Sequence, residues 1–293
     1  MQLLLSNFYG TTFLVIYRMV IIFGIVLELG AAPAPAPAPA PLLSPSEANA
    51  ILNSGWWNLS LLDPRNICSW YDIDCNDAGS ITSIRSPFHI PGIRLATLNL
   101  SAFENLETLD ASYCGLEETI PPEIGNLPKL THLHLSGNAL HGEIPPSLAN
   151  LTNLIWLDIS HNLLSGSLKP LSVGHHALLT TINLRNNSIS GEIPPELGYL
   201  PFLGTLDLSY NNLSGRVPMF LQNVPDVDLS FNNLNGPIPY GVSEFQLRGN
   251  SGICSNNSYH QTEFDFKPCP ARNKKVWHNQ LVIVLPILIF LIM

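Results

Sequence analysis

One pattern of leucines and a single asparagine returns at nearly constant spacing along this chain, and it limits the possible folds more than any other feature. In its clearest copy, Leu130, Leu133 and Leu135 are followed by Asn138 and Leu140. The position of Asn138 recurs at residues 114, 138, 162, 187, 211 and 232, in steps of 24, 24, 25, 24 and 21 residues. A repeat of this length cannot bury its apolar side chains alone, so neighbouring repeats must stack into a solenoid.

The first half of the repeat predicts a strand followed by a turn. The alternation of Leu133 and Leu135 is typical of a short strand with one face buried. The amide of Asn138 can bond backbone groups of its own turn and of adjacent turns, which predicts a ladder of such amides along the solenoid. Removing one of them would leave buried polar groups unpaired, at about 1–3 kcal/mol each. Cys114 takes the asparagine position once, as a thiol that we expect to be buried.

The second half of the repeat carries a Gly-x-Ile-Pro motif. It stands at residues 142–145 and 191–194, with related sequences at 215–218 and 236–239, a weaker copy at 118–121 and no proline in register at 166–169. Glycine permits a bend and proline favours an extended return. We therefore predict a second layer, with short 3-10 or helical turns near residues 122–125 and 195–198. One residue is inserted around 174–176, where we expect His175 and His176 to be solvated.

The period, the asparagine position and the Gly-x-Ile-Pro half resemble the plant-specific class of leucine-rich repeats. Such repeats form the ectodomains of plant receptor-like kinases and receptor-like proteins, and the resemblance covers about residues 46–270. It implies an α/β repeat protein: a right-handed leucine-rich-repeat solenoid with a parallel concave β-sheet and short 3-10 or helical turns on the convex side. It also implies an N-terminal cap over residues 46–94, repeats over 95–240 and a C-terminal cap over 241–270.

The cysteines fit the caps of this family. Two of them, Cys68 and Cys75, lie in the N-terminal cap, and Cys254 and Cys269 lie in the C-terminal cap. Four cysteines allow three pairings, and only the resemblance selects Cys68–Cys75 and Cys254–Cys269. Oxidation agrees with a secreted protein, as do six asparagines placed two residues before Ser or Thr for N-linked glycosylation. These are Asn58, Asn99, Asn150, Asn186, Asn212 and Asn256.

The N-terminal end of the chain predicts secretion. Residues 1–32 read as a signal peptide, with Arg18, an apolar run at 19–27 and small residues at 30–32. An uncleaved anchor and a true start at Met19 are alternatives. Residues 33–45 form an Ala-Pro spacer, whose prolines favour a stiff extended chain.

The C-terminal end predicts a juxtamembrane and truncated transmembrane segment over residues 271–293. Its apolar run, residues 281–293, would span only about 20 Å as a helix, against the roughly 30 Å of a bilayer core. The basic residues at 272–275 would lie outside the cell, against the usual positive-inside tendency. A lipid-anchor signal is a weaker alternative.

The charge of the body argues against nucleic acid as a partner. Residues 46–270 contain 21 acidic and 9 basic residues, whereas phosphate binding needs clustered Lys and Arg. The sequence contains no phosphate-binding glycine loop and no protein-kinase motifs, so we expect a protein that is not an enzyme and needs no cofactor. His132, His134 and His161 lie close in the repeat frame, but no matching set of cysteine or carboxylate ligands accompanies them, so we predict no metal site.

The outward positions of the predicted strands are the candidate ligand-binding residues. Large aromatic residues and arginine dominate the energetics of interfaces, and the residues that depart from the repeat average at these positions are the most informative. On the concave face they are Tyr113, His132, His134, Trp156, His161, Arg185 and Tyr210.

The resemblance implies that the protein recognises a ligand outside the cell. We expect a receptor-like protein or truncated receptor kinase in signalling or defence, held at the plasma membrane by its C-terminal tail, which binds a peptide or protein ligand and a possible co-receptor ectodomain. The alternative is a protein secreted to the cell wall or apoplast that inhibits pathogen cell-wall hydrolases or acts as a soluble decoy.

Overall fold

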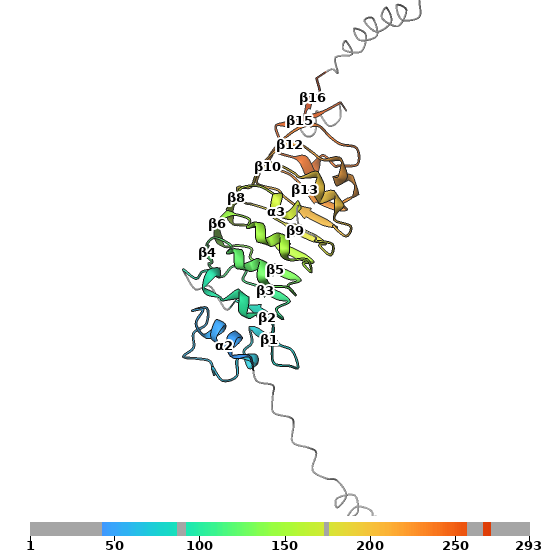
Figure 1. Ribbon diagram of the computed structural model, residues 1–293. Coiled ribbons are helices and arrows are strands. Elements are labelled where there is room, and N and C mark those ends of the chain that lie inside the picture. The colour runs from blue at the N-terminus through green and yellow to red at the C-terminus, as the bar shows by residue number, and fades with distance from the viewer. Residues whose placement is uncertain (1–42, 87–91, 173–175, 257–265, 271–293) are drawn as a thin grey trace, which may run out of the picture. The chain divides into compact units, whose positions relative to one another are not determined.

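The computed structural model describes residues 43–86, 92–172, 176–256 and 266–270 (Figure 1). The described residues belong to one compact unit, which begins at residue 43. The predicted signal peptide, most of the Ala-Pro spacer and the C-terminal segment 271–293 therefore lie outside the described residues. Within the described residues, no helix has both the length and the apolar character needed to cross a membrane.

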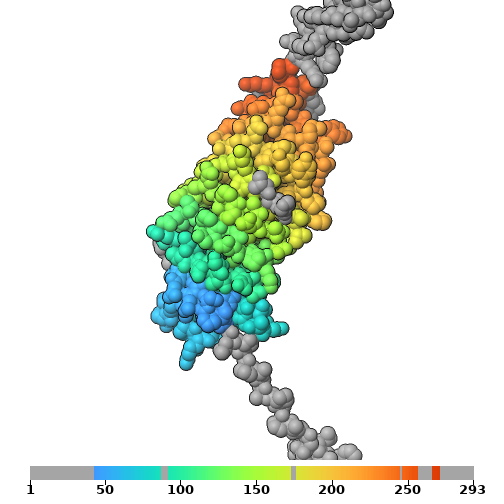
Figure 2. Space-filling model, viewed as in Figure 1, coloured from blue at the N-terminus to red at the C-terminus, as the bar shows by residue number. Residues whose placement is uncertain are grey.

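The main feature of the body is a sheet of eight strands that adds one strand per repeat. The strands from β2 to β13 pair in parallel, and β1 joins β2 in antiparallel fashion. Figure 2 shows the repeats as bands of colour in chain order, as expected where each repeat packs on its neighbours. The strands are β1 (Ile73–Cys75), β2 (Ile81–Arg85), β3 (Thr108–Asp110), β5 (His132–His134), β7 (Trp156–Asp158), β9 (Thr181–Asn183), β11 (Thr205–Asp207) and β13 (Asp226–Asp228).

Leucines of the repeat pattern form one continuous core behind this sheet. In the repeat that contains β5, Leu130, Leu133, Leu135 and Leu140 have no exposed surface. The same pattern holds from repeat to repeat, and the central residue of each strand from β3 to β13 is buried. Period-two alternation thus places one face of every strand in the core.

The predicted asparagine ladder is present. The side-chain oxygen of Asn162 accepts from the N–H of Leu140 at 3.1 Å, and its amide nitrogen donates to the carbonyls of Leu135 (2.9 Å) and Ile159 (3.1 Å). The same arrangement recurs at Asn138, Asn187, Asn211 and Asn232. It also occurs at Asn250 in the C-terminal cap, which the repeat pattern had not predicted as a ladder position. At Cys114 the buried thiol instead donates to the carbonyl of Ala111 at 2.9 Å.

A second layer of strands follows the ladder position. It consists of one sheet of three strands and one of five strands. They are β4 (Glu117–Glu118), β6 (Ala139–Glu143) and β8 (Leu163–Ser165), then β10 (Ser190–Glu192), β12 (Asn212–Arg216), β14 (Asn233–Pro237), β15 (Gly252–Ser255) and β16 (Lys267–Pro268). The division falls after β8, at the repeat that lacks the in-register proline. There a short helix, α3 (Lys169–Ser172), replaces the 3-10 turn.

Short 3-10 turns complete the other repeats, as predicted near residues 122–125 and 195–198. Pro121 and Pro194 sit at the N-terminal caps of two such turns in extended conformations, and a further proline occupies the first turn position in each. The turns are η1 (Ile67–Ser69), η2 (Leu95–Thr97), η3 (Leu100–Ala102), η4 (Pro122–Asn126), η5 (Pro146–Asn150), η6 (Pro195–Tyr199), η7 (Met219–Asn223) and η8 (Phe245–Leu247).

The prediction that His176 is solvated is wrong, and His175 lies outside the described residues. His176 is 1% exposed and its Nδ1 lies 3.1 Å from the carbonyl oxygen of Leu151. Its own carbonyl accepts from the N–H of Leu179 at 3.1 Å, as the carbonyl of Leu151 accepts from the N–H of Leu154. His176 therefore takes the place that a buried leucine holds in the neighbouring repeats, and the inserted residue precedes it.

Both caps are closed by the disulfides that the resemblance selected. Cys68 is bonded to Cys75 and Cys254 to Cys269. The N-terminal cap also contains helix α2 (Pro45–Leu52), which begins inside the range predicted as spacer, with Ser44 as its N-cap. Buried Glu47 ties this helix to the first parallel strand, because its carboxylate accepts from the N–H of Ile81 at 3.1 Å.

Candidate functional site

One face of the eight-stranded sheet points away from the core, and we call it the outer face; it is the face that was predicted to be concave. It carries the two side chains on either side of the buried central residue of each strand. Strand pairing aligns these side chains in two rows. The first row contains Thr108, His132, Trp156, Thr181, Thr205 and Asp226. The second contains Asp110, His134, Asp158, Asn183, Asp207 and Asp228. The ligand-binding residues predicted on strands β5 and β7 therefore lie on this face.

The aspartates of the second row have a structural role at the end of each strand. One carboxylate oxygen of Asp158 accepts from the backbone N–H of Ser160 at 3.0 Å. Asp110, Asp207 and Asp228 make the same contact two residues on, at 3.0, 2.9 and 2.9 Å. These contacts fix the carboxylates at the sheet edge and use only the Oδ1 oxygen of each group. They account for the repeated Asp-x-Ser sequence without any ligand.

Three rings form an aromatic patch on the outer face, consisting of His132, His134 and Trp156. The centroids of the two imidazoles lie 6.1 Å apart, and the His134 ring lies 5.8 Å from the indole of Trp156. Trp156 is 41% exposed. An exposed indole packed beside a half-buried ring is the kind of group that contributes most to protein interfaces.

His134 stands in register between two carboxylates, Asp110 on β3 and Asp158 on β7, and we call these three residues the acid–histidine row. Burial lowers the pKa of His134 from its ordinary value, an effect that both carboxylates oppose and that neighbouring His132 reinforces. The ring is therefore neutral at neutral pH. Among the residues that the structure describes, no lysine or arginine forms an ion pair with Asp110 or Asp158.

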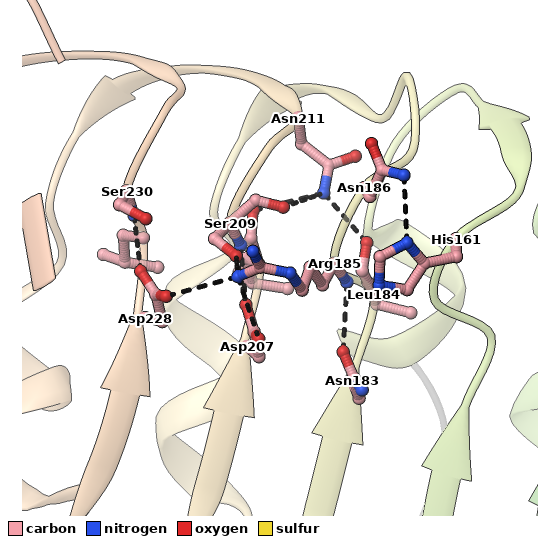
Figure 3. Close-up of polar contacts among 12 residues, drawn as sticks. His161, Asn183, Leu184, Arg185, Asn186, Asp207, Ser209, Asn211, Asp228 and Ser230 are labelled. Carbon is pink, nitrogen blue, oxygen red and sulfur yellow. Dashed lines mark hydrogen bonds and ion pairs between the residues drawn. The ribbon is translucent and has the colours of Figure 1, made fainter. Parts of the chain in front are cut away.

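Arg185 organises the other half of the outer face (Figure 3). Its Nη1 donates to the hydroxyl of Ser209 at 2.9 Å and lies 3.7 Å from the carboxylate of Asp228 and 3.9 Å from that of Asp207. The guanidinium carbon also lies 4.5 Å from the centroid of the Tyr210 ring. The single arginine thus offsets one of the two carboxylate charges within the protein.

The residue before each ladder position has an unusual backbone conformation. Tyr113, His161, Asn186, Tyr210 and Phe231 have φ between 53° and 56°, in the left-handed region that side chains other than glycine rarely adopt. Their side chains form a column along the edge of the outer face. In it the Tyr210 and Phe231 rings stack at 4.4 Å, and the amide nitrogen of Asn186 donates to Nδ1 of His161 at 3.1 Å.

The structure brings some of the predicted ligand-binding residues together and separates others. His132, His134 and Trp156 are in contact, Arg185 contacts Tyr210, and His161 contacts Asn186. Tyr113 stands apart on the first full repeat, 68% exposed. That all seven serve a ligand stays a prediction. The six predicted glycosylation sites are all exposed, and a glycan on Asn186 would be attached at the nitrogen that contacts His161.

The predicted ligand-binding set left out two residues of this surface. Phe231 is 38% exposed and stacks on Tyr210, and the guanidinium carbon of Arg248 lies 5.8 Å from its ring centroid. Arg248 stands two residues before Asn250, as Arg185 stands two residues before Asn187. Extending the repeat frame to Asn250 would have found it.

The residues that the structure describes contain no group of three or more histidines, cysteines or acidic residues that could hold a metal ion. The one unpaired thiol among them, Cys114, is buried, and this burial raises its pKa. It therefore remains protonated and fills a ladder position.

Comparison with known families supports the repeat frame. Residues 104–150 match the model described as Leucine Rich repeats (2 copies), and residues 178–200 and 202–224 match Leucine Rich Repeat. The described body is a leucine-rich-repeat solenoid. The matched segments contain strands β3, β5, β9 and β11 of the eight-stranded sheet, and β7 lies between two of them.

The leucine-rich repeats are similar to those of plant receptor kinases. The receptor-like serine/threonine-protein kinase RGI4 of Arabidopsis thaliana is 39% identical over 90 residues, 30% of this chain and 8% of that protein. The ectodomain of GASSHO1/SCHENGEN3 from the same plant, solved in complex with CASPARIAN STRIP INTEGRITY FACTOR 2, is 30% identical with a TM-score of 0.54. That match covers 60% of this chain and 21% of the other.

The ectodomain of the Arabidopsis receptor kinase HAESA was solved in complex with an N-terminally extended IDA peptide hormone ligand. It is 34% identical with a TM-score of 0.54, over 62% of this chain and 32% of that chain. The chain thus spans about a third or less of the length of each of these three relatives.

Proposed function

We propose that this leucine-rich-repeat protein recognises a peptide or protein ligand outside the cell, on the outer face of its eight-stranded sheet. The observation that carries the proposal is the set of exposed aromatic side chains there. Tyr113, Trp156 and Tyr210 are 68%, 41% and 40% exposed, although burying such side chains would be strongly favourable. Exposed aromatic residues that the core does not use are typical of binding surfaces.

The relatives support this function. The matched ectodomains of GASSHO1/SCHENGEN3 and HAESA were each solved with a bound factor or peptide hormone, and HAESA also with the co-receptor SERK1. We extend the proposal to a co-receptor ectodomain as second partner and to action by binding rather than catalysis. Because fold alone does not determine function, the proposal depends on the outer face itself.

A glycan placed on the outer face tests the proposal. The double substitution T181N/N183T creates an Asn-Ile-Thr acceptor on β9, whose neighbours in register are Trp156 and Thr205. The tagged full chain and the variant would be secreted from plant cells, incubated with extracellular fluid and compared for captured peptides by mass spectrometry. We expect the glycan to abolish capture. The predicted natural acceptor Asn150, at the end of turn η5, serves as the control when it is removed by Asn150→Gln.

Equal capture by the wild type and the T181N/N183T variant, with the new glycan confirmed, would contradict binding at this face. Capture that falls in the Asn150→Gln control as well would show only a general effect of altered glycosylation.

We further propose that the protein faces the outside of the plasma membrane as a receptor-like protein, anchored by residues 271–293. The support is the apolar run at 281–293 and the similarity to membrane receptor ectodomains. Carbonate extraction of membranes from cells that express the tagged chain, with glycosidase treatment, tests this. A glycosylated species that resists extraction agrees with a membrane-anchored receptor-like protein. A glycosylated species released to the medium would favour a secreted inhibitor or decoy instead.

A further inference from the structure

We propose that the half of the outer face built by β3, β5 and β7 docks a basic segment of the ligand, with a lysine or arginine side chain seated between the aromatic patch and the carboxylates of Asp110 and Asp158. This inference rests on the proposed function and narrows it to a class of ligand. It commits to one occupant, an extended peptide segment that carries positive charge.

The two halves of the outer face differ in how their carboxylates are compensated. Asp207 and Asp228 lie 3.9 and 3.7 Å from the guanidinium of Arg185. Within the described ranges, Asp110 and Asp158 form no ion pair with a lysine or arginine. Their Oδ1 atoms accept from backbone N–H groups, which leaves each carboxylate its negative charge. Among the described residues, a ligand cation would find second-row carboxylates that lack a basic partner only in the β3–β7 half.

The basic groups nearest to these carboxylates do not neutralise them. Arg85 aligns with Asp110 across the β2–β3 pair, but its guanidinium forms its ion pair with Asp74. His134 stands between the two carboxylates, but burial holds its pKa below the ordinary range, so that it carries no charge at neutral pH. The negative charge is therefore held beside half-buried rings, where water screens it less than at an open surface.

The aromatic patch supplies the second requirement for a cationic side chain. The indole of Trp156 is the ring type that binds cations most strongly over its face. It is 41% exposed and packs beside His134. A lysine or arginine stem can lie along these rings while its charged end reaches Asp158 on the same strand or Asp110 two strands away. The C-terminal half offers no equivalent place, because Arg185 itself already occupies the ring of Tyr210.

Charge-matched variants allow a decisive test. D110N/D158N removes the two carboxylate charges but keeps the side-chain oxygens that accept from the N–H groups of Ser112 and Ser160. E123Q/E196Q removes two charges from the exposed turns η4 and η6 and gives the same net charge. Trp156→Leu removes the ring and keeps an apolar side chain.

A random linear peptide library would be selected against the full-length protein, and the affinities of the selected peptides measured for each variant. We expect peptides enriched in lysine and arginine, with affinity about tenfold or more lower for D110N/D158N and for Trp156→Leu, and unchanged for E123Q/E196Q. An equal loss with E123Q/E196Q would overturn the inference, because only general electrostatic attraction would then remain.

The same selection separates failure of this inference from failure of the proposed function. Selected peptides that the T181N/N183T glycan blocks, but that are not basic or bind D110N/D158N as tightly as wild type, would overturn the inference and leave the proposed function intact. Selected peptides that the glycan does not block would overturn both, as would a selection that yields no binding peptide.

Discussion

The ladder position Asn162 allows a quantitative test of how the repeats hold together. Its carboxamide bonds four backbone groups, and three of these are carbonyls that keep another donor when Asn162 is truncated. Leu135 keeps the amide of Asn138, Ile159 keeps the amide of Asn187, and Ser160 keeps the N–H of a glycine in the preceding repeat. The structure therefore predicts that truncation leaves one backbone donor, the N–H of Leu140, without its acceptor.

The expected cost of Asn162→Ala follows from that count. A buried donor without a partner costs about 1–3 kcal/mol, and the small cavity left by the carboxamide adds about 1 kcal/mol. We expect the free energy of unfolding to fall by about 2–4 kcal/mol. Asn153→Ala is the matched control, because Asn153 is exposed and makes one hydrogen bond, to the carbonyl of Pro128 at 2.8 Å. Its loss should cost less than about 0.5 kcal/mol.

Urea unfolding followed by tryptophan fluorescence measures both variants, and amide hydrogen exchange locates the effect. Repeat arrays do not always unfold in one step, so exchange at the Leu140 amide is the decisive readout. It should accelerate in Asn162→Ala and stay unchanged in Asn153→Ala. If the two variants unfold alike, or if the Leu140 amide stays protected in Asn162→Ala, then the bond from the Leu140 N–H to Asn162 does not stabilise the fold.

Two further predictions follow from the structure. The affinity for basic peptides should fall as the pH drops from about 7 to about 5. The pKa of His134 lies below its ordinary value, so the ring gains its proton in this range and places a cation in the acid–histidine row. In His134→Asn the fall in affinity should be smaller, and identical pH profiles of the wild type and the variant would contradict the prediction. Gly191→Ala should lower the free energy of unfolding by about 1–2 kcal/mol, because Gly191 has a φ of 83° and its new methyl group would meet no atom nearer than 3.9 Å. In Gly204→Ala the nearest atom to the new methyl group would be 3.7 Å away, so thermal unfolding should change little, and an equal loss in both variants would refute the strain argument.

The fold was largely predictable because each position of the repeat has a defined structural role. Alternating leucines identify each strand, and the asparagine fixes the register between repeats, so Leu133 and Asn138 occupy their predicted places. His176 was predicted wrongly for the opposite reason. Its residue type suggested solvent, whereas its place in the frame, one repeat after Leu151 and two after Leu127, indicated burial. Position in the frame was the better guide.

The candidate site was only partly predictable. The outward positions follow from alternation, and Trp156 and Arg185 were named on that basis. The charge around each of them depends on side-chain contacts between repeats, and the spacing of residues in the sequence does not reveal those contacts. Arg185 reaches the carboxylates of the next two repeats, Asp207 and Asp228, whereas Trp156 remains beside uncompensated charge. From the sequence, both residues were predicted simply as ligand-binding residues.

This difference arises at one position of the repeat, two residues before the ladder asparagine. Most repeats place a serine there, among them Ser136 and Ser160, but Arg185 and Arg248 occupy it in two later ones. Each strand-ending aspartate accepts from a backbone N–H at the strand end, and an asparagine there, as at Asn183, makes the same bond without the charge. An arginine at the serine position can neutralise that charge without altering the core or the ladder. The leucine-rich repeat can thus set the charge of each part of its outer face separately from its stability.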